Sequence, residues 1–158
     1  MPQPQLLLIP KIESGIVIDH IPAGSGVQVM ALVGRWPELA GATATLGLNY
    51  KSTRMGRKDM IKLQSGPLPP RLLQMLALVT PGVTVKRIRG YEVVERVVIR
   101  LPSFFDDLAR CINPNCITNA EPHVRTRFDA LPDDPSLFRC RYCERVSTLD
   151  VLRRNIKL

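Results

Sequence analysis

The chain has 158 residues, enough for one domain or two small ones, and 45% of them are hydrophobic, which is typical of a globular protein. No stretch approaches the roughly 18 consecutive apolar residues of a membrane-spanning helix, and residues 1–10 lack the basic segment of a secretory signal peptide. The net charge of +8 suits either an anionic partner or a generally basic surface. We expect a cytoplasmic protein that keeps its cysteines reduced.

The first part of the chain predicts a strand followed by a helix. Residues 15–21 are apolar and rich in β-branched side chains and end before Pro22, a pattern typical of a strand. In the turn that follows, Ser25 can serve as the N-cap of a helix over residues 27–35, which Pro37 ends.

Two further strands are predicted over residues 42–48 and 58–63, with a polar loop between them. The period of two along the second of these strands separates its side chains into two faces. One face carries Asp59, Ile61 and Leu63, and the other carries Lys58, Met60 and Lys62.

A second helix is predicted after the proline-rich segment 66–70. Its apolar residues recur at helical spacing, namely Leu72, Met75, Leu76 and Val79. Two last strands are predicted over residues 83–88 and 91–100. The order β-α-β-β-α-β with one added strand predicts an α+β domain with a ferredoxin-like antiparallel sheet and two helices.

All four cysteines lie in the last third of the chain, as the pairs Cys111/Cys116 and Cys140/Cys143. Each short pair can turn two sulfurs toward one point, and four thiolates in a tetrahedron suit Zn²⁺. A segment as small as residues 103–158 is poorly supported by a hydrophobic core alone. We therefore predict a first domain over residues 1–102, followed by a small all-β domain over residues 103–158 that holds one structural Zn²⁺. Disulfides, an iron–sulfur cluster and four unrelated thiols are the alternatives.

No group of residues in the sequence predicts catalysis. A closed four-thiolate site has no vacant coordination position for a substrate or water. Asp19 and His20 are adjacent, so they should face opposite sides of a strand unless one of them sits at a bend. We expect a protein that is not an enzyme.

The positive charge is concentrated in the first domain. Residues 1–102 contain 13 lysines and arginines against 6 acidic residues, a net +7, whereas residues 103–158 contain 9 against 8, a net +1. A zinc ribbon that binds nucleic acid, the alternative function, would usually carry its own positive face. Cations beside apolar and aromatic groups in the first domain suit an anionic ligand with a flat ring, but the same pattern is typical of a solvated sheet face.

Seven short motifs occur in an order known from one protein family. They are VIDHIPA (residues 17–23), LGLN (46–49), MGRKD (55–59), YEVV (91–94), C-x4-CI (111–117), AEP (120–122) and C-x-YCE (140–144). Each motif is weak by itself, but together, with the unusual spacing of the first cysteine pair, they are specific. Over about residues 15–147 the chain resembles the regulatory chain of aspartate carbamoyltransferase.

The resemblance implies a non-catalytic regulatory subunit in pyrimidine biosynthesis. The first domain would bind nucleoside triphosphates, with CTP and UTP as inhibitors and ATP as activator. The zinc domain would dock on the catalytic chain of the enzyme. Regulatory chains would pair as a homodimer through the first domain, usually within an assembly of six catalytic and six regulatory chains, without a membrane or nucleic acid as partner.

The resemblance also implies the residues of each site. The nucleotide site would be formed by Ile9, Lys11, Ile12, Asp19, His20, Lys58, Met60, Lys62, Lys86, Ile88, Tyr91, Val93 and Arg96. The surface that docks on the catalytic chain would include Asn113, Asn115, Glu144 and Arg145. The chain departs from the family pattern at Leu6, Lys11, Lys86 and Arg96, which moves positive charge around the phosphate end of the site.

Overall fold

A computed structural model describes residues 9–157 of the chain, so Leu6 lies outside the described residues. The chain divides into two compact units. The first takes in the chain up to Leu72 together with Gly82–Ile99, and the second takes in Leu73–Pro81 together with the chain from Arg100 onward. Within residues 9–157, no helix is both long and apolar enough to cross a membrane.

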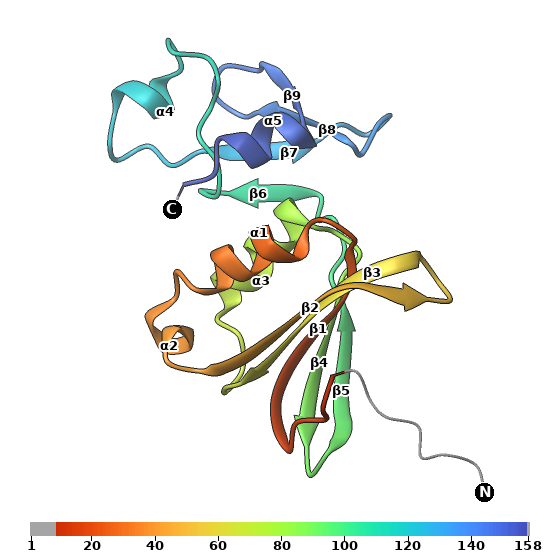
Figure 1. Cartoon of the computed structure of the whole chain (residues 1–158). Coiled ribbons are helices and arrows are strands. Elements are labelled where there is room, and N and C mark those ends of the chain that lie inside the picture. Colours follow the sequence, from red (N-terminus) through yellow and green to blue (C-terminus); the bar gives the residue numbers. More distant parts are fainter. Residues whose placement is uncertain (1–8, 158) are drawn as a thin grey trace, which may run out of the picture. The chain divides into compact units, whose positions relative to one another are not determined.

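The first unit is built on a five-stranded antiparallel sheet with the strand order β2-β3-β1-β4-β5 (Figure 1). Its strands are β1 (Ser14–Pro22), β2 (Thr43–Ser52), β3 (Gly56–Gln64), β4 (Thr84–Arg89) and β5 (Glu92–Val98). The helices along this part of the chain are α1 (Gly26–Val33), the short α2 (Pro37–Ala40) and α3 (Pro70–Val79), which begins in the first unit and ends in the second. The four strands β1 to β4 have the ferredoxin-like order, and β5 adds an edge strand, so the predicted fold class is confirmed.

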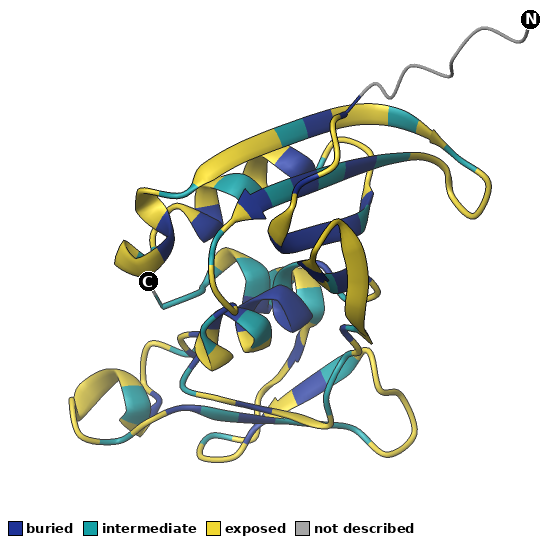
Figure 2. Cartoon of the chain, turned by 90° about the horizontal axis from the view of Figure 1, so that it is seen from below, coloured by how far each residue is buried: buried dark blue, intermediate teal, exposed yellow. Residues whose placement is uncertain are grey.

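The alternation predicted along β3 is present in the structure. Asp59, Ile61 and Leu63 are fully buried, whereas Lys58, Met60 and Lys62 are half-buried on the other face. Blocks of buried, intermediate and exposed residues follow one another along some of the strands in Figure 2. Helix α1 packs against β2 and β3 with Val29, Leu32 and Val33 buried, so the core of the first unit lies on the Asp59 side of β3.

Two bulges interrupt the strands on either side of β3. On β1 the register shifts between Ile18 and Ile21, and on β2 it shifts between Gly47 and Tyr50. A Cβ atom at position 47 would stand 2.3 Å from Ile9 Cδ1 and 2.7 Å from the Tyr50 ring, so a larger residue would displace both side chains. Beyond this bulge β2 pairs with β3 again and continues to Ser52, where the sequence predicted a loop.

The buried carboxylate of Asp59 joins the bulge on β2 to the turn between β1 and α1. Its Oδ2 accepts the N–H groups of Gly24 and Gly26 at 3.0 and 2.8 Å, and its Oδ1 accepts the N–H of Asn49 at 2.8 Å. Ser25 occupies the predicted N-cap position of α1, but its side chain makes no capping hydrogen bond. Asp59 on β3 supplies the acceptor for the first N–H of the helix instead.

The second unit holds a four-stranded antiparallel sheet with the order β6-β7-β8-β9 (Figure 1). These strands are β6 (Phe104–Asp106), β7 (Arg127–Ala130), β8 (Leu137–Cys140) and β9 (Val146–Thr148). Two short helices accompany them, α4 (Ile117–Ala120) and α5 (Leu149–Arg154). The sequence predicted only strands and loops between the cysteine pairs, so α4 is a departure from the prediction. A helix of one turn is too short to show a helical period in the sequence.

A small aromatic core fills the second unit. Phe105, Phe128 and Phe138 are fully buried, and the rings of Phe105 and Phe138 lie 5.1 Å apart at their centroids. Phe104 points to the other face of β6, where it is 41% exposed and the Arg127 guanidinium lies 3.9 Å from its ring centroid.

Replacement of Asp59 tests the junction of β3 with the bulge on β2 and with the turn before α1. Asp59→Asn replaces one accepting oxygen with an NH2 group, which would face a backbone N–H donor inside the core and leave it without an acceptor. We therefore expect the free energy of unfolding of the first unit to fall by about 2–4 kcal/mol. Urea unfolding followed by the fluorescence of Trp36, the single tryptophan, measures this loss. Glu13→Gln, the same kind of change at an exposed position, is the control and should leave the midpoint unchanged. Equal midpoints for both variants would contradict this account of Asp59.

Candidate functional site

A cavity of about 290 Å³ lies in the first unit, on the face of the sheet opposite α1. Strands β1, β3, β4 and β5 supply most of its wall, and residues 11–12, which precede β1, close one side. Its lining consists of Lys11, Ile12, Val17, Asp19, Met60, Lys62, Lys86, Ile88, Tyr91, Glu92 and Val93.

Nine of the thirteen residues implied for the nucleotide site line this cavity. They are Lys11, Ile12, Asp19, Met60, Lys62, Lys86, Ile88, Tyr91 and Val93. The remaining four lie outside the lining. Ile9 is buried near Gly47, His20 and Lys58 contact Asp19, and Arg96 is exposed on β5 opposite Lys86.

The floor of the cavity is apolar. Ile12, Val17 and Ile88 form a buried cluster on this face of the sheet. Two hydrogen bonds hold the segment before β1 against the sheet, from Lys62 Nζ to Pro10 O at 2.8 Å and from the Tyr91 N–H to Glu13 O at 3.0 Å. The segment of residues 10–13 therefore lies against the sheet and forms one wall of the cavity.

The carboxylate of Asp19 is held between two lysines at the side of the cavity. Its oxygens lie 2.8 Å from Lys58 Nζ and 2.9 Å from Lys86 Nζ, and its side chain is only 4% exposed. Burial raises the pKa of Asp19, but the bonds from Lys58, Lys86 and the His20 N–H outweigh burial and hold that pKa well below its usual range. Asp19 is therefore ionised at neutral pH.

The bulge on β1 places Asp19 and His20 together. Ile18 pairs with Ile61 and Ile21 pairs with Asp59, so these two residues oppose the single residue Met60. His20 has a left-handed backbone, with φ of 59°, and its Nδ1 lies 3.1 Å from Thr84 Oγ1. The bend that would allow Asp19 and His20 to act on the same side of the strand is thus present.

Positive charge is crowded around this side of the cavity. Burial lowers the pKa of His20, and Lys58, Lys86 and Arg54 lower it further against the opposite effect of Asp19. Burial also lowers the pKa of Lys62, with Lys11 and Lys86 adding to that effect and Asp19 opposing it. A group of cations crowded closely enough to lower the pKa values of His20 and Lys62 favours an anionic ligand.

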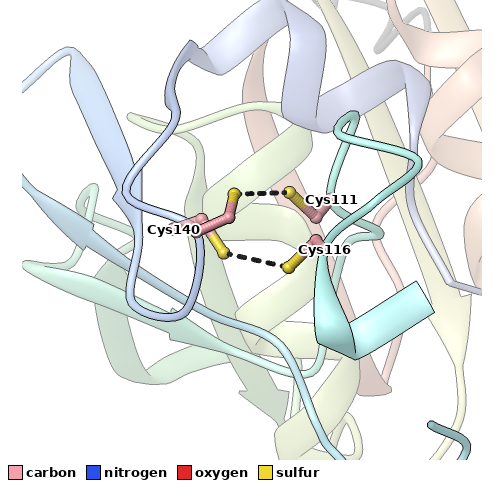
Figure 3. A group of neighbouring side chains, drawn as sticks. Cys111, Cys116 and Cys140 are labelled. Atoms are coloured by element: carbon pink, nitrogen blue, oxygen red, sulfur yellow. Dashed lines mark hydrogen bonds between the residues drawn. The ribbon is translucent and has the colours of Figure 1, made fainter. Parts of the chain in front are cut away.

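The second unit contains a cluster of its four cysteine sulfurs (Figure 3). All four Sγ atoms lie within 4.8 Å of one another. Cys111 Sγ is 3.5 Å from Cys143 Sγ, and Cys116 Sγ is 3.8 Å from Cys140 Sγ. Ligands 2.3 Å from a tetrahedral zinc ion would be roughly 3.8 Å apart, so the sulfurs fit one metal ion with little adjustment.

Two loops bring the sulfurs together. Cys111 and Cys116 bracket the loop before α4, while Cys140 ends β8 and Cys143 lies in the turn before β9. Burial raises the pKa of the Cys111 and Cys140 thiols. Burial also raises that of Cys143, but hydrogen bonds from the Arg145 backbone and from Asn113 outweigh it and lower the pKa to about 7. A bound cation would favour the thiolate at every position.

The four residues implied for docking lie beside the metal centre. Asn113 is half-buried and Asn115 is exposed in the first cysteine loop, and the exposed Glu144 and Arg145 follow the second cysteine pair. Glu144 has a left-handed backbone with φ of 64°, and its N–H donates to Cys140 O at 2.9 Å to close the turn.

Sequence reasoning did not identify several residues of these sites. Val17 and Glu92 line the cavity, and Thr118 and Asn119 bond to the first cysteine loop. Val17 shares a strand face with Asp19, so the period of two could have found it. The contacts of Asn119 depend on how the loop closes, and no spacing signals them.

Comparison with known proteins gives the same family for both units. The family model for the aspartate carbamoyltransferase regulatory chain, allosteric domain, matches residues 7–100. The model for the metal binding domain of the same chain matches residues 105–152.

Individual relatives match over nearly their whole length. The aspartate carbamoyltransferase regulatory chain of Pyrococcus horikoshii is 38% identical over 150 residues, which cover 95% of this chain and 98% of the relative. That of Methanopyrus kandleri is 38% identical, with 96% of each chain covered. That of Methanothermobacter thermautotrophicus is 36% identical, with 95% of each covered.

The low pKa of Asp19 predicts how its contribution to stability depends on pH. Asp19→Asn leaves Lys58 and Lys86 close together without a carboxylate, so we expect a loss of about 2–3 kcal/mol at pH 7. The folded-state pKa of Asp19 lies below its value of about 3.9 in an unfolded chain. The stabilisation is therefore complete above that value and is lost as the pH falls toward the folded-state pKa.

Urea unfolding of both proteins at pH 7, 5, 3 and 2, followed by Trp36 fluorescence, checks this dependence. The difference between wild type and Asp19→Asn should be equal at pH 7 and 5 and should shrink at pH 3 and 2. A difference that stays constant down to pH 2 would contradict the ion-pair account.

Proposed function

This chain belongs to the aspartate carbamoyltransferase regulatory chain family, and we propose that it controls that enzyme by binding nucleoside triphosphates in the cavity of the first unit. The chain is a regulatory subunit with an allosteric domain and a metal-binding domain, and it is not itself the enzyme. In the proposal CTP and UTP inhibit the catalytic chain and ATP activates it, within pyrimidine biosynthesis.

The observation that carries the proposal is the combination of an apolar floor and crowded cations in one cavity. A nucleoside triphosphate has a flat apolar base and a polyanionic tail, and it would use both parts. The cluster of Ile12, Val17 and Ile88 offers apolar surface for the base, with the half-exposed ring of Tyr91 at its edge. Lys11, Lys62 and Lys86 offer ammonium groups for the polar parts.

Further cations outside the lining extend the site for the phosphates. Lys58 lies beside Asp19, and Arg96 pairs in register with Lys86 on the next strand. Because Asp19 already binds both Lys58 and Lys86, a triphosphate would compete with this carboxylate for their ammonium groups. Lys11, Lys86 and Arg96 are departures from the family pattern, so the order of affinities for CTP, UTP and ATP is expected to be particular to this chain.

We propose Zn²⁺ as the metal of the second unit, with one ion per chain bound by Cys111, Cys116, Cys140 and Cys143. Four converging sulfurs at these distances support a tetrahedral thiolate site. Such a site has no vacant position, so the ion would stabilise the fold without activating water. Reduced thiolates also fit a protein of the cytoplasm.

The metal-binding domain, residues 103–158 in this proposal, docks on the catalytic chain. Asn113, Asn115, Glu144 and Arg145 are polar residues that border the metal centre from both cysteine loops, which supports a docking surface built around the ion. The nucleotide-binding domain, residues 1–102, pairs two regulatory chains, and the full assembly contains six chains of each kind. The net charge of +7 in the first domain against +1 in the second disfavours a nucleic-acid-binding zinc ribbon.

Replacement of Lys62 tests the nucleotide site. Lys62 lines the cavity and bonds Pro10 O with one of its three donors, which leaves donors for a ligand. A charge-assisted hydrogen bond contributes about 1.5–3 kcal/mol, so Lys62→Ala should weaken CTP and ATP binding by roughly ten- to a hundredfold in calorimetry. Lys51→Ala removes the same charge from an exposed position on β2 and should bind like wild type. If Lys62→Ala and Lys51→Ala bind CTP and ATP with equal affinity, Lys62 does not contribute to the nucleotide site.

Loss of a metal ligand tests the docking proposal. Cys140→Ser should abolish zinc binding and weaken the complex with catalytic chains, because thiolate–metal bonding supplies the folding energy of so small a domain. CTP binding and the Trp36 unfolding transition should persist, since both report on the first unit. Metal analysis and gel filtration with catalytic chains measure these effects. Normal assembly of a zinc-free variant would refute the proposed role of the metal.

A further inference from the structure

The two cysteine loops are closed by different means. The short loop from Cys140 to Cys143 is closed by its own backbone, through Glu144 N–H to Cys140 O and Cys140 N–H to Arg145 O, each at 2.9 Å. The longer loop from Cys111 to Cys116 has one backbone bond of this kind, from Cys116 N–H to Asn113 O at 3.0 Å. Its extra residues therefore need additional support to hold one conformation.

Asn119, in the single turn of α4, supplies that support. Its Nδ2 donates to Cys111 O and to Asn113 O, both at 2.8 Å, so the two hydrogens of one amide bind the beginning and the middle of the loop. The Asn119 N–H donates to Cys116 O at 2.9 Å, which ties the same residue to the end of the loop. Thr118 Oγ1, one residue earlier, donates to Cys116 Sγ at 3.1 Å.

The loop that Asn119 holds also presents the proposed docking residues. Asn113 is fixed through its carbonyl by Asn119, and its Oδ1 accepts the Asn115 N–H at 3.0 Å. The Asn119 side chain thus adds two of the hydrogen bonds that hold the segment carrying Asn113 and Asn115. A loop ordered before binding loses less conformational entropy when a partner docks on it.

We infer that Asn119 is a positioning residue for the interface with the catalytic chain: it holds the loop from Cys111 to Cys116 in the conformation that docks. This inference rests on the proposed docking function. A purely structural alternative is that Asn119 only helps to retain the metal. These two roles can be distinguished at saturating Zn²⁺, where every chain holds its metal. If Asn119 only retained the metal, its replacement would not affect docking under that condition.

The experiment uses the full chain at saturating Zn²⁺, with catalytic chains of aspartate carbamoyltransferase as the partner and calorimetry as the readout. Asn119→Ala removes both donors and keeps a good helix former in α4. Asn119→Asp removes the donors at nearly constant volume and serves as a second variant if the first folds poorly. The matched controls are Asn155→Ala and Asn155→Asp, because Asn155 Nδ2 also bonds a backbone carbonyl of the second unit, Val151 O at 2.8 Å, on α5 and outside the cysteine loops. The Asn155 carbonyl accepts the Arg110 N–H, but that backbone bond does not use the side chain that the controls replace.

We expect both Asn119 variants to retain one zinc per chain and to bind catalytic chains about tenfold more weakly than their Asn155 controls. Asn113→Ala is included to test the docking surface directly. If Asn113→Ala weakens binding but the Asn119 variants bind like their controls, the positioning role is wrong and the docking surface stands. If Asn113→Ala also binds like wild type, the proposed docking surface fails and the inference fails with it.

Discussion

The alternation of side chains along β3 is the constraint on which the first unit depends. One face of the strand sends the carboxylate of Asp59 into the core, where it binds backbone N–H groups of the segment that joins β1 to α1 and of the bulge on β2. The other face sends Met60 and Lys62 into the cavity. A shift of one residue in register would exchange these faces, burying two lysines and exposing the core. The fold and the cavity of this unit are therefore specified by the same strand.

The second unit depends on convergence of thiolates in place of a large core. Its sheet buries only a few aromatic side chains, and the two cysteine loops meet at one cluster of sulfurs. The C-terminal segment adds support, since Lys157 N–H donates to Leu108 O and Arg110 N–H donates to Asn155 O just before Cys111. A metal ion there would fix the loops that carry the proposed docking residues, so folding and assembly would be linked through one site.

Much of this architecture could be predicted from the sequence because it follows from periodicity and spacing. The period of two identified both faces of β3, and the paired cysteines identified the metal cluster. The bulge at Asp19 and His20 could not be predicted, because it arises from pairing with β3 and leaves no local pattern. Ser25 is at the N-cap position of α1, as the sequence predicts, but the capping acceptor comes from Asp59, which is distant in sequence. Glu92 and Asn119 were missed for the same reason, since their roles depend on tertiary contacts.

The central claim is that this chain makes the enzyme respond to nucleotides without taking part in its chemistry. A ligand can shift the assembly between two states only if it binds them with different affinity, and such couplings typically amount to about 1–3 kcal/mol. The most direct test is the rate of carbamoyl aspartate formation by catalytic chains, with and without this chain, during titration with CTP, UTP and ATP. The account predicts that the rate depends on these nucleotides only in the reconstituted complex. An identical nucleotide response with and without the chain, or no response in a fully assembled complex, would contradict it.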